Sequence, residues 1–384
     1  MAMAHDKGSP GRLPFTLAWS VVGSGLACAG PGGGARRHGP WVPQTPDGTP
    51  LRVLVPAPSG PRHAHLGWPK LVRAVDGTLV LGLLAGREHT VDGCPGASLS
   101  HDGGKTFTPP RMLAEFDRSM AYRHSGNIAL GLAADGSLVY LAMAFTEDVR
   151  NTVLGWRSMD NGRTWQTVDT SRLADNRSGS AFGEIVAVPG MGLVAFGHYR
   201  AGTELATGIW YAVSPDNGRT WGDPVPISKT RLYEPAFTFA AGRLVGLIRN
   251  DAGGHYWQLF SDDLGKTWQE TESLVGPGQR GLPSPFIMHP KGDPSRLLAL
   301  LTHRCHRPDE LAYVELWEAD ARKLDWRRVR KLVTVPEVDA PAGKGVDFGY
   351  PWMVQLSERE WLLVLYCGYV KGPNSIWGMT VRIE

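Results

Sequence analysis

The sequence predicts an all-β protein made of short strands, and more specifically a β-propeller. Three observations support this prediction. The chain contains 48 glycines and 29 prolines, a turn-like octapeptide occurs four times, and short apolar runs lie between the copies. Glycine and proline make up about a fifth of this chain, against roughly an eighth of an average protein. So many chain-breaking residues exclude a protein of long helices.

The repeated octapeptide reads Ser-x-Asp-x-Gly-x-Thr-aromatic. Its serines stand at positions 100, 158, 214 and 261, so the copies are 58, 56 and 47 residues apart. Aspartate and serine side chains hydrogen-bond to nearby backbone N–H groups, and glycine adopts a left-handed conformation, so the motif predicts a β-hairpin turn. We expect the closing Trp or Phe to pack beneath the turn. A degenerate fifth copy at 318–326 keeps Asp320 and Trp326 but lacks the glycine and the threonine.

Strand-like runs precede and follow the octapeptides. The segments 192–196, 208–213 and 242–248 are short, apolar and preceded or opened by glycine, which is typical of strands. Four short strands in roughly 50 residues is the pattern of one propeller blade. Four copies of the turn in register make this interpretation specific, whereas a single copy would carry little weight.

Charge and composition exclude several classes of protein. The chain has 40 basic and 37 acidic residues and a net charge of +3, without a basic run interleaved with aromatics, so we expect no nucleic-acid partner. The four cysteines lack C-x-x-C spacing and are too few for a disulfide framework, so they are expected to be buried free thiols. No metal or cofactor is predicted, and the oligomeric state cannot be derived from the sequence.

Residues 1–50 are predicted to be a leader and a linker, and residues 51–384 the propeller domain. Residues 13–26 are mostly apolar, and Ala-Cys-Ala at 27–29 follows them in the style of a signal-peptidase site. Two interpretations stay open. Residues 1–29 are either a cleaved signal of a secreted or periplasmic protein, or a disordered leader of a cytoplasmic one. The apolar run is too short to span a bilayer as a helix, and no integral membrane segment is expected elsewhere.

The four octapeptides resemble the Asp boxes of the sialidase (neuraminidase) superfamily, and the resemblance extends from about residue 60 to the end of the chain. It implies a six-bladed β-propeller with its Asp boxes at blade edges, away from the active site. It also implies a glycan or glycoconjugate substrate with a terminal acidic sugar, a tyrosine nucleophile paired with a glutamate, an aspartate acid/base, and three arginines around the sugar carboxylate. Asp boxes also occur in propellers that catalyse nothing, so function needs residues of its own.

The resemblance assigns the catalytic roles to three residues. Tyr350, in Asp-Phe-Gly-Tyr-Pro-Trp at 347–352, matches the nucleophile, and Glu234, in Tyr-Glu-Pro, matches its base. A neutral phenol needs such a carboxylate to accept its proton. Asp92, on the loop five residues after Arg87, matches the acid/base, with an ordinary Asp-Gly turn as the competing interpretation.

Arg249 and Arg304, each at the end of an apolar run, match two of the carboxylate-binding arginines, and Arg87 is a further candidate for substrate binding. Guanidinium groups suit this role because they bind carboxylates in a bidentate way. The pattern breaks at the first arginine, where Gly67 stands before Trp68 and a proline. The loss of one charge-assisted contact weakens the expectation of sialic acid itself.

The sequence therefore predicts an enzyme, a retaining exo-glycosidase of sialidase type that hydrolyses a terminal, acidic sugar. Two alternatives stay open. The first is a non-catalytic glycan-binding propeller, which the missing arginine favours. The second is a propeller lyase or glycosidase that works through His63, His65 or His124.

Overall fold

The computed structural model describes residues 42–117, 119–146, 150–203, 205–250, 254–276, 283–304, 311–335 and 346–384. In these residues the chain forms 26 β-strands and one short 3-10 helix, η1 (Pro61–His63), which confirms the all-β prediction. The expected leader at 1–29 lies outside the described residues. Within them, no helix has the length and hydropathy needed to cross a membrane.

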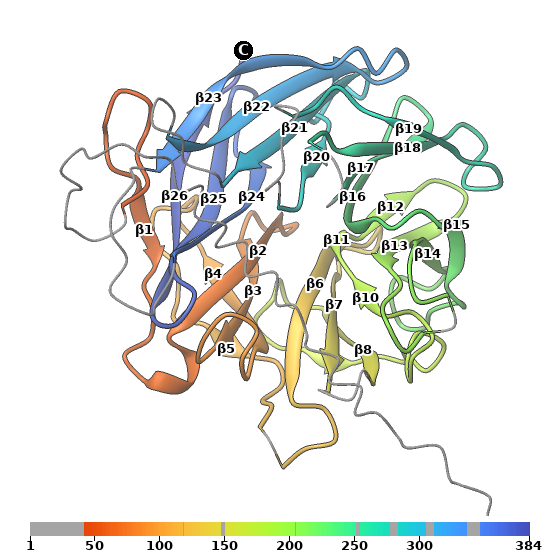
Figure 1. The fold of residues 1–384 in the computed structure, drawn as a ribbon, viewed down its shortest axis with the longest axis horizontal. Helices are drawn as coiled ribbons and strands as arrows, with labels where there is room; N and C mark the ends of the chain where they lie inside the picture. The colour runs from red at the N-terminus through yellow and green to blue at the C-terminus, as the bar shows by residue number, and fades with distance from the viewer. Residues whose placement is uncertain are drawn as a thin grey trace, which may run out of the picture.

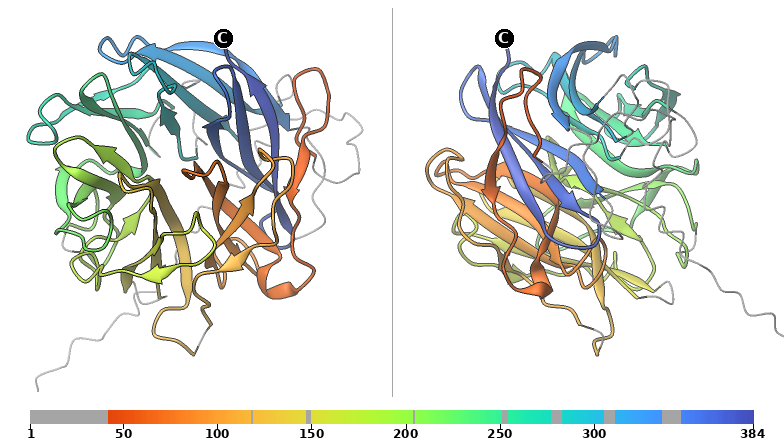
Figure 2. Two further views of the ribbon diagram at one scale, coloured as in Figure 1. Left: turned by 180° about the vertical axis from the view of Figure 1, so that it is seen from behind. Right: turned by 60° about the vertical axis from the view of Figure 1, so that its left-hand side comes forward.

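The sheets stand around a common centre, from which their strands lead outward (Figure 1). Six inner strands of the described chain contact one another in turn, and the last contacts the first, so that they close a ring. Figure 2 shows the same ring from behind and from the side. In order around the ring, the inner strands are β24 (Val346–Gln355), β2 (His65–Arg73), β6 (His124–Leu132), β11 (Gly183–Glu184), β16 (Tyr233–Ala240) and β20 (Phe286–Met288).

The largest sheet contains both ends of the described chain. Its order is β24-β25-β26-β2-β3-β4-β5, with β1 also paired to β26. The N-terminal strand β1 lies antiparallel to the C-terminal strand β26, so the ring is closed by hydrogen bonds between the two ends. The further strands of this sheet are β1 (Arg52–Val55), β3 (Leu79–Gly86), β4 (Cys94–Ser100), β5 (Arg111–Met112), β25 (Glu360–Tyr369) and β26 (Asn374–Arg382).

Four smaller sheets complete the described fold, and most of their neighbouring strands are antiparallel. The orders are β11-β6-β7-β8-β9, β10-β13-β14-β15 with β12 on β13, β16-β17-β18-β19, and β20-β21-β22-β23. Their further strands are β7 (Leu138–Phe145), β8 (Asn151–Ser158), β9 (Gln166–Thr167), β10 (Ser180–Ala181), β12 (Val186–Val188), β13 (Gly192–His198), β14 (Ile209–Ser214), β15 (Val225–Ser228), β17 (Arg243–Arg249), β18 (Trp257–Ser261), β19 (Gln269–Glu272), β21 (Arg296–His303), β22 (Ala312–Asp320) and β23 (Arg327–Val335).

The hydrophobic core lies between neighbouring sheets. Strands β3 and β7 are buried along their whole length, and each is an interior strand with a neighbour on both sides. Their sequences are accordingly near-continuous apolar runs rather than alternating ones. The runs expected at 192–196, 208–213 and 242–248 fall in β13, β14 and β17.

All four octapeptides form the same hydrogen-bonded turn. In the first, Ser100 Oγ accepts the Gly104 N–H at 2.9 Å and donates to Asp102 Oδ1 at 2.8 Å, while Asp102 accepts two bonds from Thr106. Gly104 has a φ of +85°, and a Cβ there would lie 2.3 Å from the side chain of Leu362 in β25. The corresponding bonds recur in the turns that begin at Ser158, Ser214 and Ser261.

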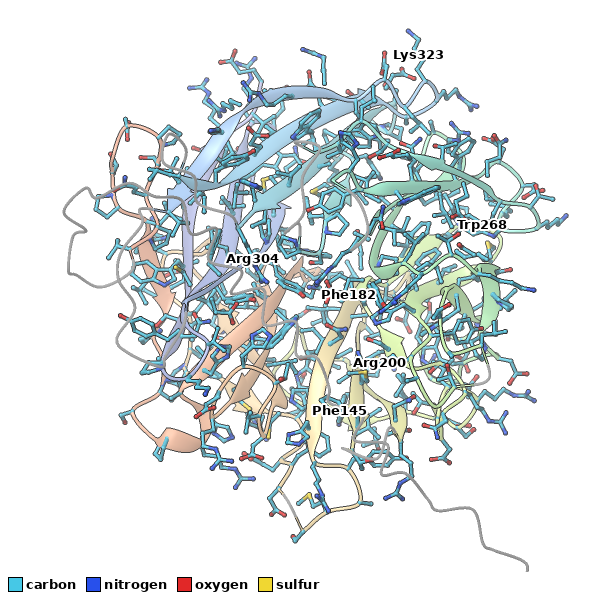
Figure 3. All side chains as sticks on the ribbon, viewed as in Figure 1. Phe145, Phe182, Arg200, Trp268, Arg304 and Lys323 are labelled. Carbon is cyan, nitrogen blue, oxygen red and sulfur yellow. The ribbon has the colours of Figure 1, made fainter. Side chains whose placement is uncertain are left out.

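The octapeptide turns lie away from the centre of the ring. Trp268, which closes the fourth copy, lies toward the rim, whereas Arg304 and Phe182 lie near the centre (Figure 3). The degenerate copy also forms a turn, in which Asp320 accepts the N–H groups of the second and third residues after it, and Trp326 is buried. These side chains hold turns and sheet edges together, so we assign them a structural role.

Replacing Trp221 with alanine should lower the free energy of unfolding by about 3–5 kcal/mol, because this indole closes the third octapeptide and is 3% exposed. Urea denaturation measures the change. Met159→Ala, in the second octapeptide, is the matched control, because this side chain is 63% exposed and should matter by less than about 0.5 kcal/mol. A loss below about 1 kcal/mol for Trp221→Ala would contradict a structural role for the turn.

Candidate active site

A tyrosine and a glutamate from opposite parts of the chain meet near the centre of the ring. Tyr350 Oη donates a 2.6 Å hydrogen bond to Glu234 Oε1, although 116 positions separate the two residues. Both side chains are buried, Tyr350 at 4% and Glu234 at 8% exposure. The structure therefore brings together the two residues that the sequence proposed as nucleophile and base, while their roles stay predictions.

The backbone explains how these side chains are presented. Trp68 in β2, Glu234 in β16 and Tyr350 in β24 each precede a proline, and their φ angles are +53°, +49° and +53°. Each also lies where the pairing of its strand with the next one shifts register. Such irregularities re-aim a side chain, and a left-handed conformation in a residue with a Cβ costs of order 1–3 kcal/mol. A left-handed residue that precedes a proline at a shift in register therefore occurs in three inner strands.

Arg249 is the third member of the group that Tyr350 and Glu234 form. It ends β17 opposite Tyr233, and its Nη1 lies 2.9 Å from Glu234 Oε2. Burial opposes ionisation of Glu234, but the charge of Arg249 and the hydrogen bond from Tyr350 outweigh it, so the pKa of Glu234 lies below its ordinary value. Burial, followed by the charge of Glu234, raises the pKa of Tyr350 far above its ordinary value. The pair is therefore a neutral phenol beside a carboxylate.

His198 fixes the backbone of the glutamate. Its side chain is fully buried at the end of β13, and burial lowers the pKa of the ring to about 3. The neutral ring accepts the Glu234 N–H at Nδ1 over 3.2 Å. His198 was not singled out from the sequence, because its partner lies 36 positions away on another sheet.

A second carboxylate, Asp347, lies three residues before Tyr350 and is 4% exposed. It accepts a 3.0 Å hydrogen bond from Tyr366 Oη, and its Oδ1 lies 3.7 Å from Nη2 of Arg304. Arg304 in turn donates 2.7 Å bonds to Tyr366 Oη and to the carbonyl oxygen of Phe348, and its guanidinium lies 5.6 Å from the ring of Tyr350. The structure therefore places Arg304 beside the Tyr350 pair, as the sequence suggested.

Two histidines and a tryptophan surround the other oxygen of Asp347. His89 Nδ1 lies 2.6 Å and His65 Nε2 3.2 Å from Asp347 Oδ2. The indole of Trp68 packs 4.8 Å from the His89 ring and 5.9 Å from the Tyr350 ring. Burial alone would raise the pKa of Asp347. The pKa nevertheless lies well below its ordinary value, because His89, His65 and Arg304 stabilise the carboxylate. Of this group, only His65 was selected from the sequence, as a candidate of the histidine-dependent alternative.

The loop between β3 and β4 carries Arg87 and Asp92. Arg87 Nη2 donates to Asp92 Oδ2 at 2.6 Å, and the Asp92 N–H donates to His124 Nδ1 at 2.8 Å. Among the described residues, no hydrogen bond or ion pair joins Arg87 or Asp92 to Tyr350 or Glu234. The roles expected of Arg87 and Asp92 therefore stay predictions, and His124 serves here to hold the loop.

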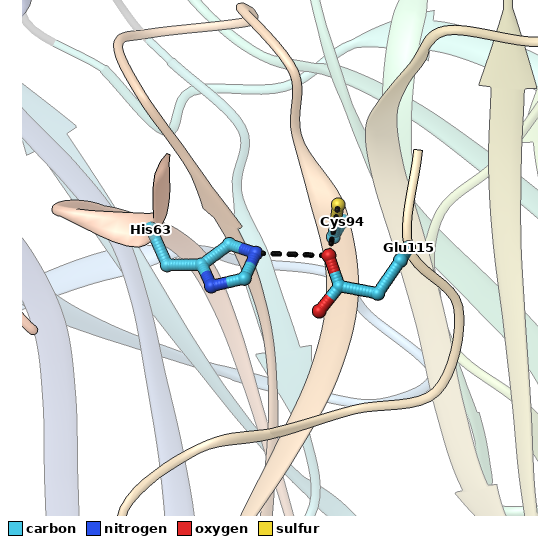
Figure 4. Close-up of side chains that lie close together, drawn as sticks. All are labelled: His63, Cys94 and Glu115. Atoms are coloured by element: carbon cyan, nitrogen blue, oxygen red, sulfur yellow. Dashed lines mark hydrogen bonds and ion pairs between the residues drawn. The ribbon is translucent and has the colours of Figure 1, made fainter. Parts of the chain in front are cut away.

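Two clusters in the described chain bring three potential metal ligands within 4.8 Å of one another. One is His65, His89 and Asp347. Its 2.6 Å contact is shorter than the roughly 3 Å or more that separates N and O ligands on one metal, so hydrogen bonding explains it better. The other, shown in Figure 4, is defined by contacts of 3.2 and 3.7 Å from His63 and Cys94 to one carboxylate oxygen of Glu115.

The spacing in the second cluster would suit zinc, but the charge around it would not. The guanidinium of Arg62 lies 3.0 Å from the same Glu115 oxygen, where it would oppose a cation. Cys94 is a buried free thiol, as expected, and so is Cys367. Burial raises the pKa of Cys94 to about 11, which keeps the thiol protonated. We assign no metal to either cluster, and the other two cysteines lie outside the described residues.

Comparison with known proteins defines the fold. No family model matches the chain, and no curated protein matches it. Its structure is similar to a Dyadobacter fermentans protein of unknown function, with a TM-score of 0.63 and 19% identity over 87% of this chain and 99% of that one. It is also similar to the Hadza microbial sialidase Hz136, with a TM-score of 0.59 and 17% identity over 84% of this chain and 68% of that one.

A third similar structure is an α-L-arabinanase of Penicillium chrysogenum complexed with arabinobiose. Its TM-score is 0.58 at 15% identity, over 86% of this chain and 97% of that one. At such identities the likeness shows the fold alone. The chain is therefore a β-propeller of the type found in sialidases and other glycosidases.

A lysine lies behind the candidate nucleophile. Lys70 is fully buried in β2, and its Nζ lies 4.3, 4.7 and 5.8 Å from the ring centres of Phe182, Trp352 and Tyr350. Its one described hydrogen bond is a 3.3 Å contact to the carbonyl oxygen of Pro69. Burial lowers the pKa of Lys70 from 10.5 to about 7. Lys70 is therefore a buried cation beside the site, and it loses its proton as the pH rises through neutrality.

Lys70→Met should raise the free energy of unfolding more at pH 6 than at pH 10. The unfolded lysine keeps its proton up to about pH 10.5 and the folded one only to about pH 7, so wild-type stability should rise between these values. A pKa difference of this size corresponds to about 5 kcal/mol. Urea denaturation from pH 6 to 10 should give a flatter profile for the variant. An unchanged profile would show that Lys70 is not buried as a cation.

Proposed function

We propose that the protein is a retaining exo-glycosidase of sialidase type, built on a six-bladed propeller whose four octapeptide turns are Asp boxes. The observation that carries the proposal is the buried 2.6 Å hydrogen bond from Tyr350 to Glu234. A phenol becomes a useful nucleophile only when an adjacent base takes its proton, and this contact provides that base. The substrate is a glycan or glycoconjugate with a terminal sugar.

The reaction proceeds in two steps. Tyr350 Oη attacks the anomeric carbon while Glu234 takes the phenol proton, and an acid from the 87–92 loop protonates the leaving oxygen. Water then displaces Tyr350 by attack on the face that the leaving group vacated, so two successive inversions retain the configuration of the sugar. Asp92 is the acid proposed from the sequence. Arg249 stabilises Glu234 as a carboxylate before the reaction and faces the phenol oxygen at 3.5 Å.

Arg249 and Arg304 form a reduced clamp for the carboxylate of an acidic sugar. Each already faces a carboxylate of the protein, at 2.9 and 3.7 Å respectively. Gly67 stands where a third guanidinium would be expected. Recognition of an acidic sugar should accordingly be weak and sensitive to salt.

Tyr350→Phe removes the nucleophilic oxygen and keeps the ring. Hydrolysis of a responsive aryl glycoside should fall by about 10³-fold or more, with little change in Tm. Tyr122→Phe is the matched control, because this half-buried tyrosine bonds to Asp175 rather than to the site. The assay is kcat/KM on a panel of aryl α-glycosides that includes sialic and uronic acids. Normal activity of Tyr350→Phe would remove this tyrosine from the mechanism.

Gly67→Arg tests the missing contact by gain. A Cβ at Gly67 would meet only the His65 ring, at 3.6 Å, so the backbone accepts a side chain. Binding of a sialic acid transition-state mimic should tighten about tenfold or more, which is about 1.4 kcal/mol. Gly60→Arg, in open space, adds the same charge elsewhere and should have no such effect. Equal tightening in both variants, or unchanged acidic-ligand binding after Arg249→Ala, would rule out the clamp.

A glycan-binding propeller without catalysis is the second candidate, and Gly67 is the observation that favours it. Such a protein needs aromatic and polar groups at the centre of the ring but no nucleophile. Tyr350→Phe would then leave glycan affinity unchanged, and the wild type would show no turnover.

A further inference from the structure

His89 lies beside Asp347 and Trp68, although no sequence pattern marks it. Its Nδ1 faces Asp347 Oδ2 at 2.6 Å, and its backbone N–H donates to the carbonyl oxygen of Val370 at 2.9 Å. The side chain is 19% exposed, whereas Asp347 is 4% exposed. Among the described residues, none forms a hydrogen bond with the other ring nitrogen, Nε2. Nδ1 of His89 is thus bonded to Asp347, whereas Nε2 has no hydrogen-bond partner in the described chain.

Asp347 is suited to orient this ring. A carboxylate that binds one nitrogen of a histidine fixes the ring orientation and its tautomer, so that the second nitrogen can exchange a proton with a substrate. Asp347 is kept ionised by several donors and is itself held by Tyr366 at 3.0 Å. The two carboxylates near the centre therefore have different partners: Glu234 binds the Tyr350 phenol, and Asp347 binds the His89 imidazole.

Trp68 connects the two groups. Its indole contacts the His89 ring at 4.8 Å and the Tyr350 ring at 5.9 Å. A sugar bound at Tyr350 would therefore have His89 on the other side of one indole ring. Histidine is the commonest general acid/base of enzymes, because its proton exchanges near neutral pH.

We propose that His89, oriented by Asp347, is the catalytic acid/base of this site and acts on the glycosidic oxygen through Nε2. The inference rests on the proposed glycosidase function and deepens it. Asp92, the acid expected from the sequence, is paired through Oδ2 with Arg87 at 2.6 Å, while its Oδ1 has no hydrogen-bond partner in the described chain, so Asp92 is the alternative that the test has to exclude. With His89 as the acid/base, Asp92 serves to hold the loop that carries His89.

The proton and electron balance is complete without a further reactant. In the first step Tyr350 Oη bonds to the anomeric carbon and gives its proton to Glu234. The leaving oxygen takes the electron pair of the broken C–O bond and the proton of His89 Nε2. In the second step neutral His89 removes a proton from water, the water oxygen bonds to the anomeric carbon, and the phenolate of Tyr350 leaves and recovers its proton from Glu234.

The pH dependence of proton transfer by His89 depends on the charged and titratable groups near its ring. Asp347 and His65 come from β24 and β2, Tyr366 comes from β25, and Arg304 directly follows β21. The groups are Asp347, His65, Tyr366 and Arg304, together with Arg87 and Asp92 on the loop itself.

The test compares leaving groups. Removal of a general acid slows substrates with poor leaving groups most, because a dinitrophenolate departs without a proton. For His89→Gln we expect kcat/KM to fall about 10²–10⁴-fold on an alkyl or disaccharide substrate and far less on the dinitrophenyl glycoside. With the dinitrophenyl glycoside the variant should show a burst, since hydrolysis of the intermediate loses its base. Asp347→Asn, as a positioning change, should shift the alkaline limb of the wild-type pH–rate profile.

His289→Gln is the matched control, because that histidine follows β20 and its hydrogen bond in the described chain is to the carbonyl oxygen of Pro290 rather than to the site. The Tm of each variant is measured alongside. A His89→Gln variant within a few-fold of wild type on the alkyl substrate, or one equally slow on both substrates, would overturn the proposal. A leaving-group-dependent loss in Asp92→Asn instead would assign the acid to Asp92.

The outcomes also separate this inference from the function on which it rests. A wild type that cleaves no substrate of the panel, or a Tyr350→Phe variant with normal activity, would refute the glycosidase mechanism and the role of His89 with it. Loss of activity in Tyr350→Phe together with normal activity in His89→Gln would refute the role of His89 alone.

Discussion

A carboxylate must remain ionised in a nearly dry interior for the proposed chemistry to work. Burial alone would raise the pKa of Glu234, and chiefly the Arg249 guanidinium at 2.9 Å and the Tyr350 phenol at 2.6 Å outweigh that effect. Without Arg249 the glutamate would be a poor base, and without Glu234 the phenol would be a poor nucleophile. The fold therefore has to hold three side chains from β16, β17 and β24 within hydrogen-bonding distance.

The centre of the ring repeats this arrangement with a second set of residues. Asp347 is also buried, and it also faces one arginine, Arg304, and one tyrosine, Tyr366. Each of the two anions is paired with its own guanidinium group, so the carboxylate of an acidic substrate would compete with Glu234 and Asp347 for Arg249 and Arg304. The two sets differ in two ways: the tyrosine of the Glu234 set is the candidate nucleophile Tyr350, and Asp347 has two further partners, His89 and His65. This division suits one group that forms a covalent bond and another that moves a proton.

The sequence predicted well what depends on local chemistry. The octapeptide turns follow from side-chain bonds within four residues, as Ser100 and Asp102 show. The contact of Tyr350 with Glu234, over 116 positions, could be expected only through the resemblance to sialidases. The sequence could not predict contacts that need the ring to close. His89 and Asp347 lie 258 positions apart, and neither has a local pattern that marks it. One sequence feature does connect Trp68 with the site: it precedes a proline, as Glu234 and Tyr350 do.

The central claim is that Tyr350 becomes covalently bound to the sugar, and trapping tests it most directly. A fluorosugar with a good leaving group forms the intermediate faster than it is hydrolysed, because fluorine slows both steps and the leaving group restores only the first. Intact-mass and peptide analysis after incubation should then show one sugar per chain, attached to Tyr350 in β24 (Val346–Gln355). A label on any other residue, or turnover of the probe with inverted configuration and no adduct, would contradict the account.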